Sequence, residues 1–255
     1  MYNHAMTLRF TPRSRRIAVV FTALASLIIF LVSNPASYQL IFDSAPNSPA
    51  NPPANSPTSL RATDILAKLE VKGRAPKTGY SRTQFYKQWP DLDGCSLRQR
   101  IIKREFGDTA KLDAKCNVVA GSFLEPYNGV AMEFSTKAQI SKALQIDHIV
   151  ALSDAWQKGA KYHSKAIRYQ IATDPLNLIA ADGPANMQKS DSDAASWLPK
   201  NKAFRCQYVA RQIAVKYKYQ LWVSQAEHDA MKQVLSTCPN QLIAEVSPVL
   251  YPPKT

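Results

Sequence analysis

Residues 145–189 contain the stretch that decides the fold: Asp147-His148-Ile149-Val150, then Asp174-Pro175-Leu176-Asn177-Leu178-Ile179, then Asn186-Met187-Gln188-Lys189. An Asp-His pair ends one apolar run, a single Asn lies in a second apolar run, and another Asn opens a polar stretch. Such a set can supply a general base, an orienting group and a metal ligand. These three are the minimum for metal-assisted hydrolysis of a phosphodiester.

The same stretch predicts two strands and a helix. Residues 143–150 form a strand that carries the Asp-His pair, and residues 176–180 form its antiparallel partner. Residues 154–168 form a helical insertion between the strands, and residues 186–193 form the helix that follows. Neighbouring side chains on a regular strand point to opposite faces. The Asp-His pair can therefore share a site only where the strand ends or bulges.

The ordered set resembles the HNH (His-Me finger, ββα-metal) endonucleases, particularly exported bacterial proteins with a GmrSD-type C-terminal HNH domain. The resemblance covers residues 80–238. Its most specific features are the Asp-His-Ile-Val string, the spacing of nine positions between Asn177 and Asn186 (186 minus 177), and Asn186-x-x-Lys189. It implies an α+β fold with a small antiparallel sheet and a ββα-metal core, residues 143–195, surrounded by helices.

The Asp-His pair and Asn186 are the candidates for base and metal ligands. His148 is either a core histidine or the general base, since a neutral imidazole can take a proton from water near pH 7. Asp147 either pairs with a lysine or binds a hard divalent cation. The resemblance places the second ligand at Asn186, which could otherwise be a helix N-cap. Many members have His there, so Asn favours Mg²⁺, with Mn²⁺ as the alternative, over Zn²⁺ or Ni²⁺.

Further polar residues are candidates for positioning and for phosphate contact. By resemblance, Asn177 holds the loop after His148 through a backbone hydrogen bond. Lys189 lies one helical turn beyond Asn186 and either reaches a phosphate oxygen or is an ordinary surface lysine. A guanidinium matches phosphate oxygens, so Arg168 or Arg98 could stabilise the pentacovalent phosphate, unless each forms a surface salt bridge.

Composition favours an acidic partner. The 255 residues carry a formal net charge of +13. Nucleic acid is the leading candidate, DNA first and RNA second, and an anionic membrane or envelope polymer is the runner-up. The sequence thus predicts a metal-dependent endonuclease of low sequence specificity. The alternative is a non-catalytic basic cell-envelope protein that binds nucleic acid or another anionic polymer without cutting it.

The N-terminal part predicts export. Within residues 1–42, four arginines precede an uncharged apolar run over residues 17–32, which indicates a signal peptide or a retained signal anchor. Residues 43–59 are rich in Pro, Asn and Ser and form a linker. Residues 60–255 form the nuclease domain. We expect the protein to be secreted or periplasmic, or anchored to the outer side of the cytoplasmic membrane; the membrane is a partner only in the anchored case.

Four cysteines, Cys95, Cys116, Cys206 and Cys238, have no Cys-x-x-Cys spacing, which argues against a zinc knuckle. Outside the cytoplasm two disulfides are expected. Three pairings are possible. We favour Cys95–Cys116 with Cys206–Cys238 because each bridge then closes a local segment.

The segments before residue 143 predict helices first and a small sheet afterwards. Ser81 and Ser96 are expected to cap helices over residues 82–89 and 97–106. Residues 117–120 and 130–134 are expected to be strands, with Gly121 and a turn between them.

The segment of residues 196–222 contains six basic residues and no acidic one. Its apolar residues recur at helical spacing, so most of these charges are expected to point outward. Ser224 with Glu227 predicts a capping box for the last helix. The six basic residues are Lys200, Lys202, Arg205, Arg211, Lys216 and Lys218.

Overall fold

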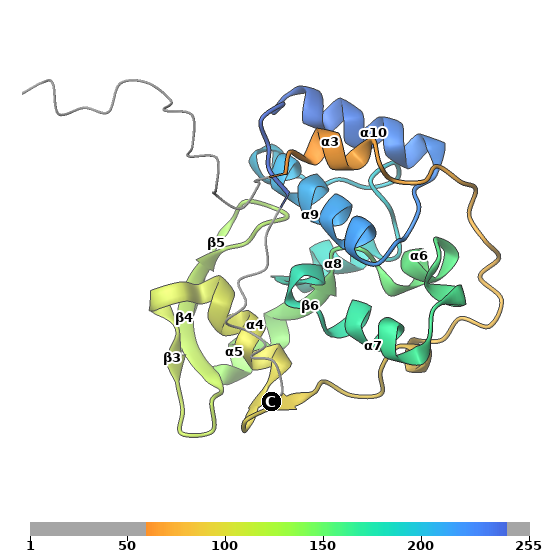
Figure 1. Cartoon of the computed structure of the whole chain (residues 1–255). Helices are drawn as coiled ribbons and strands as arrows, with labels where there is room; N and C mark the ends of the chain where they lie inside the picture. Colours follow the sequence, from red (N-terminus) through yellow and green to blue (C-terminus); the bar gives the residue numbers. More distant parts are fainter. Residues whose placement is uncertain (1–59, 244–255) are drawn as a thin grey trace, which may run out of the picture. The chain divides into compact units, whose positions relative to one another are not determined.

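The computed structural model describes residues 60–243 and is organised around an antiparallel hairpin of β6 (Leu144–His148) and β7 (Leu178–Asp182) (Figure 1). The pairing is regular from Leu144 opposite Asp182 to His148 opposite Leu178. His148 is thus the last residue of β6, so the Asp-His pair lies where the strand ends. Two neighbouring residues can share a site at such a position. The α+β fold class is confirmed.

Both faces of β7 are buried. Leu178 and Ala180 pack in a cluster with α4 (Leu97–Phe106), whereas Ile179 and Ala181 pack in a cluster with the C-terminal helices. This alternation follows from the two-residue period of a strand. It explains why β7 is a continuous apolar run, and it places the hairpin between two cores.

On one side of the hairpin, three helices pack against one another: α3 (Ala62–Leu66), α9 (Arg205–Lys218) and α10 (Gln225–Ser236) (Figure 1). Their buried residues recur at helical spacing, such as Val209 and Ile213 on α9. The two ends of the described chain meet beside them, since Ile243 N donates to Leu60 O at 2.9 Å.

A three-stranded antiparallel sheet forms on the other side, in the order β3 (Lys111–Leu112), β4 (Val118–Leu124), β5 (Ala131–Phe134). Gly121 lies inside β4 and does not separate strands as expected. A Cβ at this position would lie 2.8 Å from the carbonyl oxygen of Thr109, so the close approach of the backbone at Thr109 requires glycine.

Between β6 and β7 the chain forms a helical insertion, as predicted. It consists of α6 (Leu152–Gln157), η3 (Ala160–Tyr162), α7 (Lys165–Thr173) and η4 (Pro175–Asn177).

The helix α8 (Gly183–Lys189) follows β7 directly and completes a ββα arrangement. It begins three residues before the predicted start, because Asp182 caps it by accepting from Ala185 N at 3.3 Å. Asn186 is therefore inside the helix, and the N-cap interpretation of Asn186 is wrong.

The predicted caps differ in outcome. Ser96 caps α4, where its side chain accepts from Gln99 N, as expected. Ser81 makes no side-chain cap, and the helix expected after it is only a 3₁₀ turn, η1 (Arg82–Gln84). Ser224 caps α10, but the Glu227 side chain does not return to the cap; it lies in a buried cluster of ion pairs described below.

Five more short elements complete the described chain: β1 (Asp91–Leu92), β2 (Cys95–Ser96), η2 (Gly107–Thr109), α5 (Lys137–Ala143) and η5 (Lys202–Phe204). The favoured disulfide pairing is confirmed: Cys95 bonds Cys116, and Cys206 bonds Cys238. The second bridge joins the start of α9 to the residues after α10.

The export segment expected in residues 1–42 and the linker of residues 43–59 lie outside the described residues. Within residues 60–243, no helix has both the length and the apolar character needed to cross a bilayer.

Candidate functional site

One cleft of about 440 Å³ brings the Asp-His pair and the second Asn together. Asp147 and His148 line it from the end of β6, Asn186 lines it from α8, and Lys77 and Arg82 line it from the segment around η1. The ββα arrangement therefore places a carboxylate, an imidazole and an amide at one solvent-accessible hollow.

Asp147 is a buried carboxylate held by two donors. Its Oδ2 accepts a 2.5 Å hydrogen bond from the Tyr127 hydroxyl, and Lys189 Nζ lies 2.9 Å from the same oxygen and 3.1 Å from Oδ1. Burial and the nearby Asp147 charge raise the pKa of Tyr127 well above its usual value, so the phenol remains a donor. Asp147 is thus held in position by Tyr127 and Lys189.

Lys189 differs from both sequence interpretations. Its side chain is fully buried, and Nζ also donates to the carbonyl oxygen of His148 at 2.8 Å. The surface-lysine interpretation is wrong, and the ammonium is occupied with Asp147 instead of pointing toward a phosphate. Burial of an unpaired carboxylate is costly, and this pair removes that cost.

His148 has one nitrogen committed to the backbone. Its Nε2 lies 2.9 Å from the carbonyl oxygen of Ala172 on α7. A carbonyl can only accept, so Nε2 carries the hydrogen. Burial, then the charge of Arg82 and to a smaller degree that of Lys189, lowers the pKa of His148 to about 3, while the bond to Ala172 opposes the shift. The ring is therefore neutral near pH 7, and Nδ1 is an unprotonated acceptor.

Two aromatic rings hold the imidazole plane. Trp89 stacks on His148 with ring centroids 6.0 Å apart and an interplanar angle of 12°. Tyr86 contacts the same ring at 6.0 Å between centroids and 48° between planes. These contacts and the bond to Ala172 restrict both the position and the tautomer of His148.

Asn177 is fully buried and binds the backbone that follows His148. Its Oδ1 accepts from Val150 N at 2.8 Å, and its Nδ2 donates to Val150 O at 3.3 Å and to Ile171 O at 3.0 Å. The Asn177 carbonyl also accepts from Ile149 N at 2.8 Å. One amide therefore joins the end of β6, the end of α7 and the start of β7.

Asn186 is half-buried on α8. Its Nδ2 donates to Gln145 Oε1 at 2.8 Å, which orients the amide across the start of the cleft. The other end of the amide is a neutral oxygen, the donor type that hard divalent cations accept.

Comparisons with known proteins agree with this architecture. Residues 98–234 match the family of GmrSD restriction endonucleases, C-terminal domain. A protein of Arthroderma benhamiae named "Uncharacterized secreted protein" is 33% identical over 194 residues, which cover 75% of this chain and 91% of that protein. This chain belongs to the GmrSD C-terminal domain family. No solved structure matches it.

The family match contains the Asp-His pair, Asn177 and Asn186, but it begins after the segment that supplies the other wall of the cleft. Lys77 and Arg82 in that segment were not singled out by sequence reasoning. The signal that could have found them is charge: residues 75–90 contain three basic residues and no acidic one. Arg82 Nη2 donates to the Tyr86 hydroxyl at 2.7 Å, and Lys77 pairs with Asp191 at 2.8 Å.

Arg168, predicted as a phosphate contact, is not among the residues that line the cleft. Its guanidinium donates to Gln84 O at 3.0 Å and to His163 O, and lies 5.5 Å from the Trp156 ring centroid. The alternative, Arg98, donates to Leu144 O at 3.1 Å and is likewise absent from the cleft lining. In the structure each arginine thus binds backbone carbonyls outside the cleft lining.

The basic residues of α9 also differ from expectation. Arg211 is buried and donates to the carbonyl oxygens of Leu176 at 3.0 Å and Leu178 at 2.8 Å. Lys216 is fully buried, 3.1 Å from Asp154 and 2.9 Å from Glu227. These two charges therefore do not face solvent, whereas Lys200 and Lys202 are exposed.

Lys216 belongs to a buried ion cluster. Lys158 is its centre, with Nζ 2.7 Å from Asp154, 2.7 Å from Asp193 and 2.6 Å from Glu227. Arg74 adds a 2.7 Å contact to Asp193. The cluster joins the insertion, the segment after α8 and the two C-terminal helices. We define it by six residues: Arg74, Asp154, Lys158, Asp193, Lys216 and Glu227.

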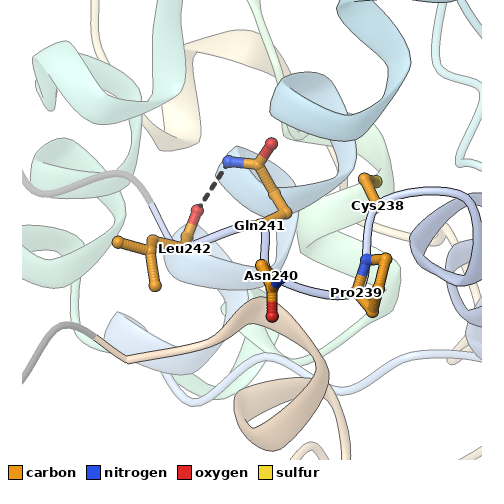
Figure 2. A pocket seen from close by; sticks show the side chains of 5 residues that line it. All are labelled: Cys238, Pro239, Asn240, Gln241 and Leu242. Atoms are coloured by element: carbon orange, nitrogen blue, oxygen red, sulfur yellow. Dashed lines mark hydrogen bonds between the residues drawn. The ribbon is translucent and has the colours of Figure 1, made fainter. Parts of the chain in front are cut away.

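A second hollow lies where the chain leaves α10 (Figure 2). It is lined by Cys238, Pro239, Asn240, Gln241 and Leu242, and Gln241 Nε2 donates to Leu242 O at 2.9 Å within it. Cys238 is bonded to Cys206. None of the five lining side chains is therefore an acid, a base or a free thiol.

Proposed function

We propose that this chain is a metal-dependent endonuclease that hydrolyses phosphodiester bonds of DNA, with RNA as a second substrate, at low sequence specificity. The observation that carries the proposal is His148: a neutral imidazole with its Nε2 hydrogen bound to Ala172 and its Nδ1 bare, beside Asp147 and Asn186 in one cleft. Membership of the GmrSD C-terminal domain family supports the same reaction class.

His148 would act as the general base. Nδ1 accepts a proton from a water molecule, the water oxygen bonds to phosphorus, and the bond from phosphorus to the leaving oxygen breaks. The pKa of about 3 belongs to a cleft in which Arg82 and Lys189 are the nearby charges. A bound phosphodiester adds a negative charge that opposes these cations, so substrate itself raises the basicity of His148.

The Asp147 carboxylate and the Asn186 amide oxygen are donors of the kind that Mg²⁺ prefers. Among residues 60–243 no group of three or more His, Cys, Asp or Glu side chains could enclose a metal ion. Mg²⁺ does not need such a cage, since it is commonly bound by one or two carboxylates together with water and phosphate. Asp147 and Asn186 would hold the cation through oxygen. When bound, it supplies positive charge that stabilises the phosphate and the leaving oxygen.

The remaining roles concern position and location. Asn177 would keep the segment after His148 in place, and Lys189 would hold the Asp147 carboxylate.

We further propose that residues 1–42 direct export, that residues 43–59 form a linker and that residues 60–255 form the nuclease domain. Two disulfides and the name of the fungal relative support an oxidising compartment.

The test is plasmid cleavage by the full chain with Mg²⁺ or with EDTA. His148→Ala should lower turnover by about 10² to 10⁴-fold at every Mg²⁺ concentration, since the base is lost but the charges remain. Asp147→Asn should lose activity that higher Mg²⁺ partly restores. Asn is preferable to Ala here because it leaves Lys189 a hydrogen-bond acceptor.

Each outcome decides between the two functions. Cleavage that requires a divalent cation and is lost in a folded His148→Ala variant supports the nuclease. Wild-type protein that binds DNA and RNA but cleaves neither with any divalent cation contradicts it, and leaves the non-catalytic binder. Undiminished cleavage by His148→Ala would place the base on another residue.

A further inference from the structure

A groove that is separate from both hollows described above lies between the segment of residues 83–87 and α7. Its volume is about 630 Å³, within the range of roughly 300 to 1,000 Å³ that small-molecule sites occupy. Lys87 and Lys165 are exposed at its walls, and the Tyr169 ring on α7 is 42% exposed. We call it the Tyr169 groove.

The Tyr169 groove adjoins the residues of the catalytic cleft through two elements. Arg82 lines the cleft and Thr83, the next residue, lines the groove. Tyr86 lines the groove, contacts the His148 ring and accepts from Arg82. On the other side, α7 supplies Tyr169 to the groove and the carbonyl of Ala172 to His148. A ligand in the groove is therefore one ring away from the base.

The charge at the groove is positive. Two of its eight lining residues, Lys87 and Lys165, are basic and exposed, and none of the eight is acidic. Basic residues around an exposed aromatic ring are the features that bind nucleic-acid strands without sequence preference.

We propose that the Tyr169 groove binds an unpaired nucleotide of the substrate strand next to the phosphodiester in the cleft, so that the protein prefers single-stranded nucleic acid to duplex. In a duplex the base faces are stacked on one another, and only an unpaired base can stack on Tyr169. Lys87 and Lys165 would contact the strand's phosphates. This inference rests on the proposed nuclease function for what occupies the cleft.

Binding is measured by fluorescence anisotropy in EDTA, so that no probe is cleaved. The probes are a short fluorescein-labelled oligothymidylate and a labelled blunt-ended duplex of two complementary strands. Tyr169→Ala in the full chain should raise the dissociation constant for the oligothymidylate about 5- to 150-fold, the loss of one stacking platform. The constant for the duplex should change less than about twofold, and Tyr169→Phe should retain tight binding because the ring is kept.

Tyr162→Ala is the matched control. Tyr162 is 69% exposed and stacks on Trp222 outside the groove, with centroids 6.3 Å apart. It should bind the oligothymidylate as wild type does. Lys87→Gln should reduce the salt slope of oligothymidylate binding by about one unit. Equal weakening of both probes by Tyr169→Ala, or no weakening of either, overturns the proposal.

The groove and the nuclease can fail separately. If wild-type protein cleaves plasmid with Mg²⁺ while Tyr169→Ala binds oligothymidylate normally, the groove assignment is wrong and the nuclease stands. If wild-type protein cleaves nothing but Tyr169→Ala loses oligothymidylate binding selectively, the groove is supported and the nuclease is not.

Discussion

Replacing Lys158 by Met tests whether the buried ion cluster holds the insertion in place. The Lys158 ammonium is 0% exposed and lies within 2.7 Å of Asp154, Asp193 and Glu227. Methionine has a similar length and no charge, so the substitution removes the cation with little change in packing. The expected result is a large loss of stability.

The magnitude follows from charge balance. The cluster has three cations and three carboxylates, a formal sum of zero, and the variant leaves it at −1 with an uncompensated buried carboxylate. Breaking a buried pair in this way costs about 3 to 5 kcal/mol. Because a domain is stable by only about 5 to 15 kcal/mol, the variant should lose a large part of its free energy of unfolding.

Urea unfolding followed by circular dichroism gives the free energy of unfolding. Lys202→Met, at an exposed lysine, should change it by less than about 0.5 kcal/mol. The double variant Lys158→Met with Glu227→Gln restores a net charge of zero, so it should lose at least about 1 kcal/mol less than the sum of the two single variants. A loss below about 1 kcal/mol for Lys158→Met, or strict additivity in the double variant, would refute the argument.

Three further predictions follow from burial and bonding. Oxidised protein should show no free thiol after denaturation, and reduction should lower the free energy of unfolding by about 3 to 4 kcal/mol per bridge in a urea titration. Lys200→Gln with Lys202→Gln should flatten the salt dependence of nucleic-acid binding, whereas Arg211→Gln should lower the thermal midpoint instead. Burial alone would raise the pKa of Asp193, but the bonds and charges of Lys158 and Arg74 outweigh it and lower the pKa. Stability from Asp193 is therefore complete above its unfolded pKa of about 3.9 and is lost progressively as the pH falls from there through the lowered folded pKa, and Asp193→Asn should flatten an acid-unfolding curve in that range.

The local features of this fold were predictable because short-range rules determine them. The hairpin strands follow from apolar runs, the Ser96 cap follows from its position before a periodic segment, and the pairing of Cys206 with Cys238 follows from proximity in sequence. The sequence also indicated that Asp147 and His148 could share one cleft only at a strand end or a bulge, and the structure has them at the end of β6. Boundaries were less accurate, as the earlier start of α8 shows.

The burial of lysines could not be predicted in the same way. From helical periodicity, charged residues are expected on the outer face of a helix. Lys216 of α9 is charged, yet it is 0% exposed. Its partners, Asp154 and Glu227, come from α6 and α10. Only the tertiary arrangement places these carboxylates together, and no property of α9 alone reveals it.

Part of the site was missed for the same reason. The Asp-His pair and Asn186 belong to one ordered motif that resembles a known family, so their proximity was foreseeable. The groups that hold these residues do not belong to the motif. Tyr127 binds Asp147, and Tyr86 and Trp89 contact His148, but all three come from earlier segments that contain no motif. That these three side chains position Asp147 and His148 can be seen only from the distances between them in the folded structure.

The insertion between β6 and β7 takes part in setting the chemistry of the site. His148 lies on β6, yet its tautomer is set by the carbonyl of Ala172, 24 residues later, at the end of α7. Asn177 bonds the backbone at both Val150 and Ile171 and so couples the insertion to the strand. The ion cluster in turn ties α6 to α9 and α10 through Lys158 and Asp154. Because the carbonyl of Ala172 keeps the hydrogen on Nε2 and leaves Nδ1 as the acceptor, a shift of α7 that broke this bond would remove what fixes the tautomer of His148.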